Sequence, residues 1–195
     1  MPIRVPDNLP ALRALHAESV DIIPQKQAVR QDIRPLRLLL LNLMPKKRDT
    51  EIQFARLFGN TPLQVEMILM TTASYTPQNT EPGYLRRFYR QLDDVRDNYF
   101  DALIITGAPI ETLPFEKVKY WAELTEIMEW SREHCFRRLG VCWGAQALLW
   151  HFHKVHKHEL KAKLFGIFEH HLSDVSGRLM HGFTDQFPMP ASRYT

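Results

Sequence analysis

Residues 140–146 read Gly140-Val141-Cys142-Trp143-Gly144-Ala145-Gln146. They lie between a predicted strand at 136–141 and a predicted helix at 144–153. Small residues two places before and two places after Cys142 allow the tight strand-to-helix turn known as a nucleophile elbow. The N-terminus of such a helix lowers the pKa of a thiol and offers backbone N–H groups. The segment therefore predicts that Cys142 is a nucleophile.

The other cysteine, Cys135, has none of these features and ends a predicted helix. Most cysteines are small buried hydrophobic residues, and we expect this for Cys135. A disulfide between the two is not expected, because an extended strand would hold them roughly 20 Å apart, against the roughly 6 Å that a bridge allows.

Outward from the turn, strands and helices alternate. Helices are expected over 84–92, 115–134 and 144–153, with another that begins at Asp49 or Thr50 and buries Leu57 among its apolar residues. Alternation of this kind predicts an α/β fold with a mostly parallel sheet flanked by helices, and an active site beyond the carboxyl ends of the strands. The strands are expected at 36–42, 63–70, 101–106 and 136–141.

Residues 1–35 hold five of the thirteen prolines and are interpreted as an N-terminal arm. The α/β domain is expected over residues 36–195, with no second domain.

Composition limits the possible partners. Of 195 residues, 45% are hydrophobic and 24% charged, and the net charge is only +3 with basic residues spread along the chain. These values indicate a globular protein without a nucleic-acid partner. The longest apolar run, Leu38–Leu41, is too short to span a membrane, and the first residues lack the apolar core of a signal peptide. A cytoplasmic protein with reduced thiols is expected.

Histidines could serve as bases or metal ligands. No carboxylate or thiolate completes a metal site with the histidines after residue 150, so a solvated helix end is expected and no metal. The histidines of this stretch are interspersed with two lysines. The residues are His151, His153, Lys154, His156, Lys157 and His158.

The turn Thr106-Gly107-Ala108-Pro109 ends a neighbouring predicted strand. On its own it is compatible with an ordinary turn. Beside an elbow it has a use, because a tetrahedral intermediate on Cys142 needs two hydrogen-bond donors. We expect the backbone N–H of Trp143 and an N–H near Gly107 or Ala108 to form this oxyanion hole, each donor contributing about 3–4 kcal/mol.

Several motifs along the whole chain together resemble the homoserine O-acyltransferase family, the homoserine transacetylases and transsuccinylases. They are the opening Met1–Pro6, the run Leu41–Lys47, the turn Thr106–Pro109, Val141-Cys142-Trp143 and Glu169-His170-His171. The resemblance implies a class I glutamine-amidotransferase-like, flavodoxin-like fold.

The resemblance also implies an activity, in methionine biosynthesis. Acetyl-CoA or another acyl-CoA would acylate Cys142, CoA would leave, and the γ-hydroxyl of L-homoserine would take the acyl group. The implied enzyme is a homodimer with small-molecule substrates and no permanently bound cofactor.

Three further site residues follow from the resemblance alone. Lys163 and Ser192 match positions that contact the amino-acid substrate, although Ala191 stands where some relatives carry histidine. Glu111 matches the position that goes with donor choice, glutamate with acetyl-CoA and glycine with succinyl-CoA. A carboxylate there would repel the distal carboxylate of a succinyl group, so acetyl transfer is expected.

The family's catalytic His-Pro-Glu motif does not occur in the sequence, and Glu169-His170-His171 is a separate segment. We therefore expect neither His170 nor His171 to be the base, and we expect a chain truncated at its C-terminus.

Several alternatives stay open. The donor could be succinyl-CoA, and the acceptor could be L-serine, because one methylene gives only about 1–3 kcal/mol of discrimination. A thiol amidase or glutaminase would use the same elbow, and the chain could be inactive or only bind ligands. Lys46, Lys47 and Arg48 could meet the phosphates of CoA or simply form a solvated approach to a helix.

Overall fold

The computed structural model describes residues 3–6, 8–18, 20, 22–25, 34–77, 79–173, 180 and 182–195. The chain divides into two compact units, Met1–His156 and Lys157–Thr195. This division differs from the expected single domain over 36–195. Each unit is described by itself.

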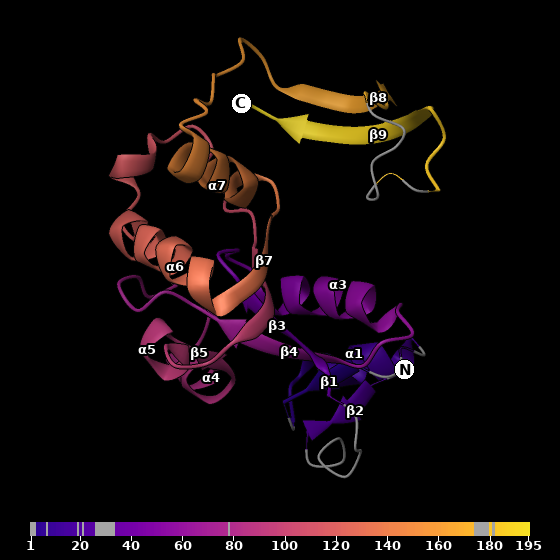
Figure 1. Cartoon of the computed structure of the whole chain (residues 1–195), viewed down its shortest axis with the longest axis vertical. Coiled ribbons are helices and arrows are strands. Elements are labelled where there is room, and N and C mark those ends of the chain that lie inside the picture. Colours follow the sequence, from indigo (N-terminus) through magenta and orange to yellow (C-terminus); the bar gives the residue numbers. More distant parts are fainter. Residues whose placement is uncertain are drawn as a thin grey trace. The chain divides into compact units, whose positions relative to one another are not determined.

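The first unit is built on a parallel sheet (Figure 1). Its strand order is β2-β1-β4-β3-β6-β7, with the short β5 paired to β4, and every pairing is parallel. The fold is therefore α/β with a parallel sheet, as the alternating pattern predicts. The strands are β1 (Ile3–Val5), β2 (Ile22–Pro24), β3 (Leu36–Leu41), β4 (Val65–Met70), β5 (Tyr89–Arg90), β6 (Phe100–Ile105) and β7 (Cys135–Gly140).

The central strand β3 shows why the sheet forms. Leu39, Leu40 and Leu41 are all fully buried, although neighbouring side chains of a strand point to opposite faces. A continuous apolar run is what a strand needs when both faces are covered. Leu41 pairs with Met70 of β4 and with Ile105 of β6, so these strands end at one level and their following loops gather there.

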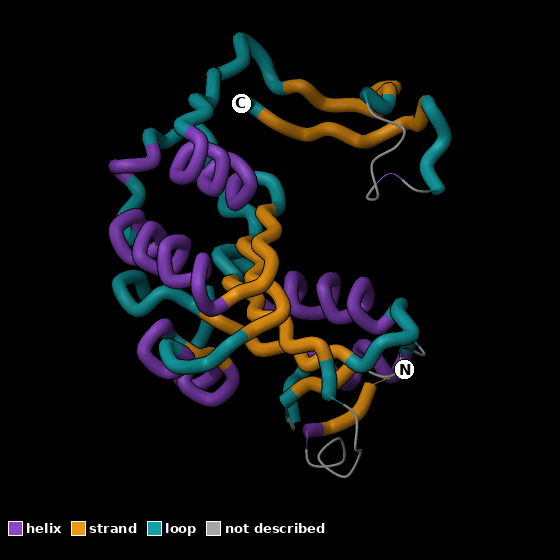
Figure 2. The backbone as a smooth tube through the Cα atoms, in the orientation of Figure 1, coloured by secondary structure: helices purple, strands orange, loops and turns teal. Residues whose placement is uncertain are grey.

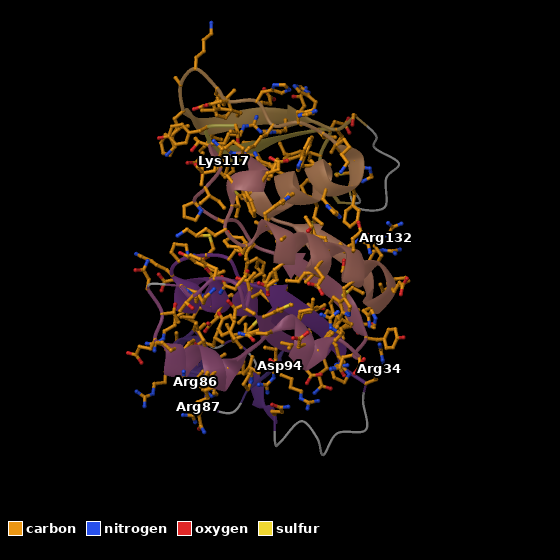
Figure 3. All side chains as sticks on the ribbon, turned by 90° about the vertical axis from the view of Figure 1, so that its left-hand side faces the viewer. Arg34, Arg86, Arg87, Asp94, Lys117 and Arg132 are labelled. Atoms are coloured by element: carbon orange, nitrogen blue, oxygen red, sulfur yellow. The ribbon has the colours of Figure 1, made fainter. Side chains whose placement is uncertain are left out.

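Helices cover both faces of the sheet (Figure 2). Leu39 and Leu41 belong to a core cluster shared with α6 and α7, whereas Leu40 belongs to a cluster shared with α1, α3 and α4. Charged side chains such as Arg86, Arg87 and Arg132 are exposed (Figure 3). The helices are α1 (Ala11–Ala17), α3 (Lys47–Gly59), α4 (Pro82–Phe88), α5 (Leu92–Val95), α6 (Trp121–His134) and α7 (Trp143–His153), with a 3₁₀ turn, η1 (Phe115–Lys117).

The N-terminal residues do more than form an arm. β1 pairs with β4 on one side and with β2 on the other, so both lie in the sheet. Val5, Leu9 and Leu15 are buried in the core cluster to which α3 contributes Ala55. The frequent prolines suggested an arm, but the apolar side chains between them supply enough buried surface to join the core.

Helix boundaries also differ from the expectation. The helix expected at 84–92 ends at Phe88, and β5 follows it before α5 begins. α3 begins at Lys47, ahead of Asp49, and Leu57 is 68% exposed instead of buried. The buried face of α3 runs through Lys47, Glu51 and Ala55 at four-residue spacing, so Leu57 lies away from it.

The second unit contains an antiparallel pair, β8 (Leu164–His171) and β9 (Gln186–Arg193). Phe165 pairs with Ser192, and Phe165 and Ile167 are each 76% exposed. Within the described ranges, no helix of the chain is both long and apolar enough to cross a membrane.

Candidate active site

Cys142 lies in the strained turn that the sequence predicts. Its backbone has φ 54° and ψ −120°, a conformation that a non-glycine residue rarely adopts and that costs about 1–3 kcal/mol. It follows the end of β7 and immediately precedes α7, and its thiol is exposed. The carbonyl oxygen of Cys142 accepts a hydrogen bond from Ala145 N–H at 3.0 Å, which closes the first turn of the helix.

Two glycines make this turn possible. A Cβ on Gly140 would lie 2.4 Å from the Cα of Ala145, and a Cβ on Gly144 would lie 2.4 Å from the carbonyl oxygen of Ile105. Both neighbours are backbone atoms, which cannot move aside without distorting β6 or α7. The glycines two before and two after Cys142 are therefore required by close backbone approach.

The end of β6 lies against the cysteine. Val141 N–H donates to the Ile105 carbonyl at 2.9 Å, which holds the two strand ends together. A Cβ on Gly107 would lie 3.6 Å from the Sγ of Cys142. The turn at Gly107 and Ala108 is thus beside the thiol, where an oxyanion-hole donor would have to be.

Trp143, the first residue of α7, holds the turn in place through its buried side chain. Its side chain is fully buried and packs against Phe115, Tyr120 and Trp121. Its backbone N–H is one of the first four of the helix, which have no intrahelical acceptor. Buried packing of the indole fixes the direction of that N–H.

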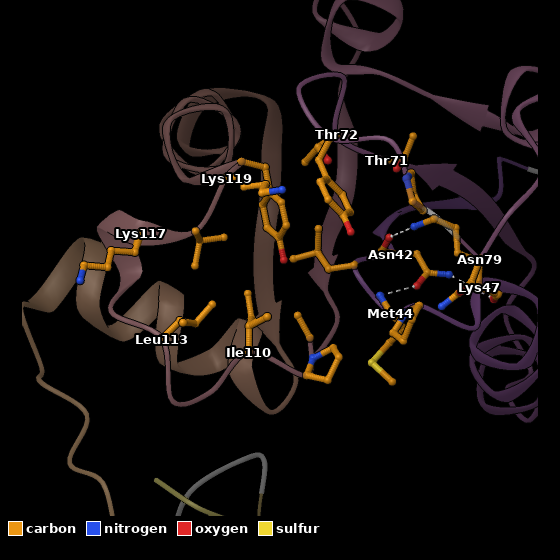
Figure 4. A pocket seen from close by; sticks show the side chains of 18 residues that line it. Asn42, Met44, Lys47, Thr71, Thr72, Asn79, Ile110, Leu113, Lys117 and Lys119 are labelled. Carbon is orange, nitrogen blue, oxygen red and sulfur yellow. Dashed lines mark hydrogen bonds between the residues drawn. The ribbon is translucent and has the colours of Figure 1, made fainter.

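Beyond the ends of β3, β4 and β6 is a cavity of about 320 Å³, the cavity of Figure 4. Ala108 and Pro109 line it and directly follow Gly107, the residue beside the thiol of Cys142. The residues that line it are Asn42, Leu43, Met44, Pro45, Lys47, Thr71, Thr72, Tyr75, Pro77, Asn79, Ala108, Pro109, Ile110, Leu113, Lys117, Val118, Lys119 and Tyr120.

A buried polar network forms one wall of the cavity. The amino group of Lys47 donates to the carbonyl oxygen of Asn42, and the hydroxyls of Tyr84 and Tyr89 both donate to Glu51 at 2.6 Å. Burial lowers the pKa of Lys47 to about 8, against the opposing charge of Glu51. Burial also raises the pKa of Glu51, against the two tyrosine hydrogen bonds.

Another wall is the loop after β4, which α6 holds in place. The carboxylate of Glu123 accepts the backbone N–H groups of Ala73 and Ser74 at 2.7 Å each, and also the hydroxyl of Ser74. Tyr75, next along this loop, lines the cavity and its ring lies 5.6 Å from that of Tyr120. The position of this loop after the end of a parallel strand is the sequence signal that it belongs to a site.

The remaining predicted residues fall in different places. Glu111 is half-buried. In the sequence it stands between Ile110 and Leu113, which line the cavity, but it is not itself among the lining residues. Lys163 and Ser192 both belong to the second unit. There Ser192 pairs with Phe165, and the amino group of Lys163 lies 5.4 Å from the centre of the Phe165 ring. Lys163 and Ser192 therefore both neighbour Phe165 of the β8–β9 hairpin.

The basic trio divides into three different environments. Lys46 is exposed, Lys47 is buried, and the guanidinium of Arg48 lies 4.6 Å from the centre of the Tyr84 ring. Lys47 alone of the three lines the cavity. The two exposed lysines that do so, Lys117 and Lys119, were not singled out from the sequence.

Other reactive side chains are buried or bound to neighbours of their own. Cys135 is buried at the start of β7, and burial raises the pKa of its thiol to about 12. His170 Nδ1 lies 3.0 Å from the carbonyl oxygen of Phe168, and His151 bonds to Glu129. Among the described residues, no three His, Cys, Asp or Glu side chains gather so as to hold a metal ion.

Comparison with known proteins identifies the family to which the chain is similar. Residues 2–195 match the family model described as homoserine O-succinyltransferase. A homoserine O-acetyltransferase of Synechococcus elongatus is 55% identical over all 195 residues, which cover 65% of its length. Proteins of the same name from Allorhizobium ampelinum and Hyphomonas neptunium are 50% and 49% identical, with 63% and 64% of their lengths covered. The chain thus spans a little under two thirds of these relatives.

Proposed function

The chain belongs to the homoserine O-succinyltransferase family, and from this premise we propose that it is an O-acyltransferase acting through Cys142. It moves an acetyl group from acetyl-CoA to the γ-hydroxyl of L-homoserine by way of an acyl-cysteine. The observation that carries the proposal is the exposed thiol of Cys142 at φ 54°, in a turn that two glycines make possible.

The chemistry has two halves. The Cys142 thiolate attacks the thioester carbonyl of the donor, a C–S bond forms, and the bond to CoA breaks as CoA leaves as a thiolate that takes up a proton. The γ-hydroxyl of homoserine then loses its proton and attacks the acyl-cysteine, which releases the ester and restores the thiolate. In both halves a negative oxygen develops next to Cys142.

The turn beside the thiol supports a role in holding this oxygen. The N–H of Trp143 at the start of α7, together with an N–H at Gly107 or Ala108, supplies two donors from two strand ends. Each such donor contributes about 3–4 kcal/mol to lowering the barrier.

The names of the relatives and the charge of Glu111 support the proposed donor and acceptor. Several relatives are named homoserine O-acetyltransferase, whereas the family model carries the name of the succinyltransferase. We favour acetyl because the carboxylate of Glu111 would repel a succinyl group. Lys163 and Ser192 would contact the amino-acid acceptor, Lys163 through its carboxylate. The protein would then serve methionine biosynthesis in the cytoplasm as a homodimer.

Intact mass measurement tests the proposal. After incubation with acetyl-CoA, the chain is expected to gain one acetyl group, which Cys142→Ala abolishes and Cys135→Ala retains. An adduct that survives in Cys142→Ala would contradict the assignment of the nucleophile. Competition between equal amounts of acetyl-CoA and succinyl-CoA, read in the same spectrum, decides the donor: a predominant succinyl adduct would overturn the role given to Glu111.

A further inference from the structure

The cavity lies beyond the strand ends, close in sequence to the turn beside the nucleophile. A Cβ on Gly107 would lie 3.6 Å from the Sγ of Cys142, and the next two residues, Ala108 and Pro109, form part of the cavity wall. Its volume of about 320 Å³ is in the range of pockets that hold small organic molecules. A ligand that reaches Ala108 and Pro109 therefore has one end near Gly107, the residue beside the thiol of Cys142.

Most of the wall is apolar, with a few polar groups between. Thr72 and Asn79, both in the loop between β4 and α4, offer polar groups, whereas the amide of Asn42 is engaged by Lys47, Tyr89 and Met44. A wall of this kind suits a flexible chain that is partly apolar and carries a few amide groups. The apolar contributors include Leu43, Met44, Ile110, Leu113 and Val118.

The charge of the wall has one sign. Among the described residues, three lysines line the cavity, Lys47, Lys117 and Lys119, and no lining residue is acidic. Lys47 is buried, whereas Lys117 and Lys119 are exposed, and Figure 4 shows the last two on the side opposite Lys47. Uncompensated positive charge at an open cavity attracts anionic ligands.

Carboxylates close to these segments in sequence are already engaged. Glu51 accepts from two tyrosines, Glu123 from the loop after β4, and Glu116 from the indole N–H of Trp150 at 3.2 Å. Glu51 also faces the buried amino group of Lys47, which donates to the carbonyl oxygen of Asn42. Among the described residues no ion pair engages Lys117 or Lys119, so these two cations remain available for a ligand.

We propose that this cavity binds the phosphopantetheine arm of the CoA donor, with the pantetheine chain against the apolar wall and the phosphates at Lys117 and Lys119. The inference rests on the proposed function, because it takes the donor to be a CoA thioester. It moves the phosphate contact away from Lys46, which does not line the cavity, and from Arg48, which stacks on Tyr84.

Desulfo-CoA tests the site without acyl transfer, because it has no sulfur to form a thioester. Calorimetry is expected to show binding that Lys117→Glu/Lys119→Glu weakens roughly tenfold or more, since charge-assisted hydrogen bonds are lost. A control with the same charge change, Arg13→Glu/Arg132→Glu at exposed positions of the first unit outside the cavity lining, is expected to bind within about twofold of the parent chain, because screening leaves distant charges little effect.

Methyl labelling of methionine locates the bound probe. Met44 lines the cavity, whereas Met67 and Met128 of the same unit are buried in the core clusters and do not, so the Met44 methyl resonance is expected to shift more than theirs when desulfo-CoA is added. Assignment follows from Met44→Leu. No binding, binding without a shift of Met44, or equal weakening by both double variants would each overturn the proposal.

The two proposals fail separately. If desulfo-CoA binds at Met44 but acetyl-CoA leaves no adduct on Cys142, the acyltransferase proposal is wrong and the cavity assignment stands. If Lys117→Glu/Lys119→Glu needs no more acetyl-CoA than the parent chain to form the adduct, the cavity assignment is wrong and the nucleophile assignment stands.

Discussion

At the scale of single residues, the turn around Cys142 shows how close backbone approach selects glycine. Gly144 has the carbonyl oxygens of Ile105 and Thr106 where a Cβ would be, at 2.4 and 2.7 Å. Neither oxygen belongs to a flexible side chain, so an added methyl group must push two secondary-structure elements apart. The conformational strain at Cys142 persists because these contacts leave the turn no other path.

Gly144→Ala is accordingly expected to lower the free energy of unfolding by about 2 kcal/mol or more, the range of overpacking in a rigid environment. Gly83→Ala is the matched control. A Cβ on Gly83, within α4, meets nothing within 4 Å, and alanine there is expected to stabilise by about 0.5–1 kcal/mol. Urea unfolding of both variants measures the difference, and equal stabilities would contradict the crowding argument.

Lys47 illustrates a buried charge that is tuned by its surroundings. Its pKa is about 8 in the folded chain and returns toward 10.5 on unfolding, so the unfolded chain binds more protons between these pH values. Stability contributed through this group therefore rises as pH increases from about 8 to 10.5.

Lys47→Met removes this titration. The free energy of unfolding of the parent chain, measured relative to Lys47→Met, is expected to increase by up to about 3 kcal/mol over that pH window. Lys46→Met, at the exposed neighbouring position, is expected to show no such trend. A flat difference between the parent chain and Lys47→Met would show that burial does not depress the pKa of Lys47.

At the scale of elements, α6 does more than cover the sheet. Through Glu123 it accepts two backbone N–H groups and one hydroxyl from the loop after β4. That loop contributes Thr71, Thr72 and Tyr75 to the cavity wall. A helix on one face of the sheet thus fixes a loop at its carboxyl edge.

Replacing Glu123 with glutamine is expected to loosen the loop while α6 stays folded, because an amide presents only one acceptor oxygen. Amide hydrogen exchange at Ala73 and Ser74 is expected to accelerate about tenfold, as charge-assisted hydrogen bonds are replaced by weaker ones. Glu133→Gln, at an exposed position of the same helix, serves as the control. Unchanged exchange in Glu123→Gln would contradict the anchoring role.

At the scale of the whole molecule, the two buried clusters lie entirely within the first unit. Both draw on β3 and β6, one with α6 and α7 and the other with α1, α3 and α4. The second unit instead exposes large apolar side chains of its hairpin, Phe165 and Ile167 among them. Stability of the α/β sheet therefore arises from residues before Lys157.

A chain ending at His156 is expected to retain the sheet. Its thermal unfolding should remain cooperative, with Tm within about 4 °C of the parent chain, equivalent to less than about 1–2 kcal/mol for a chain of this size. Circular dichroism follows the transition. A non-cooperative transition would show that the hairpin residues are needed for the core.

Much of this protein was readable from local patterns. The apolar run at 36–41, the alternation of strands and helices, and the glycine spacing around Cys142 are features of neighbouring residues, and each predicted what the structure shows. Such features are local because a buried strand and a tight turn constrain the side chains within them.

Other features depended on residues far apart in sequence. The N-terminal strands joined the sheet because β4 offered them a partner, and Leu57 is exposed because packing chose the face through Glu51 and Ala55. The cavity combines loops after three strands that end at one level, so Lys117 and Lys119 acquire their setting only when β3, β4 and β6 align. Local sequence patterns are thus enough to predict the α/β class and the elbow at Cys142. The surroundings of both emerge only on folding, since burial and shared space depend on how distant segments pack.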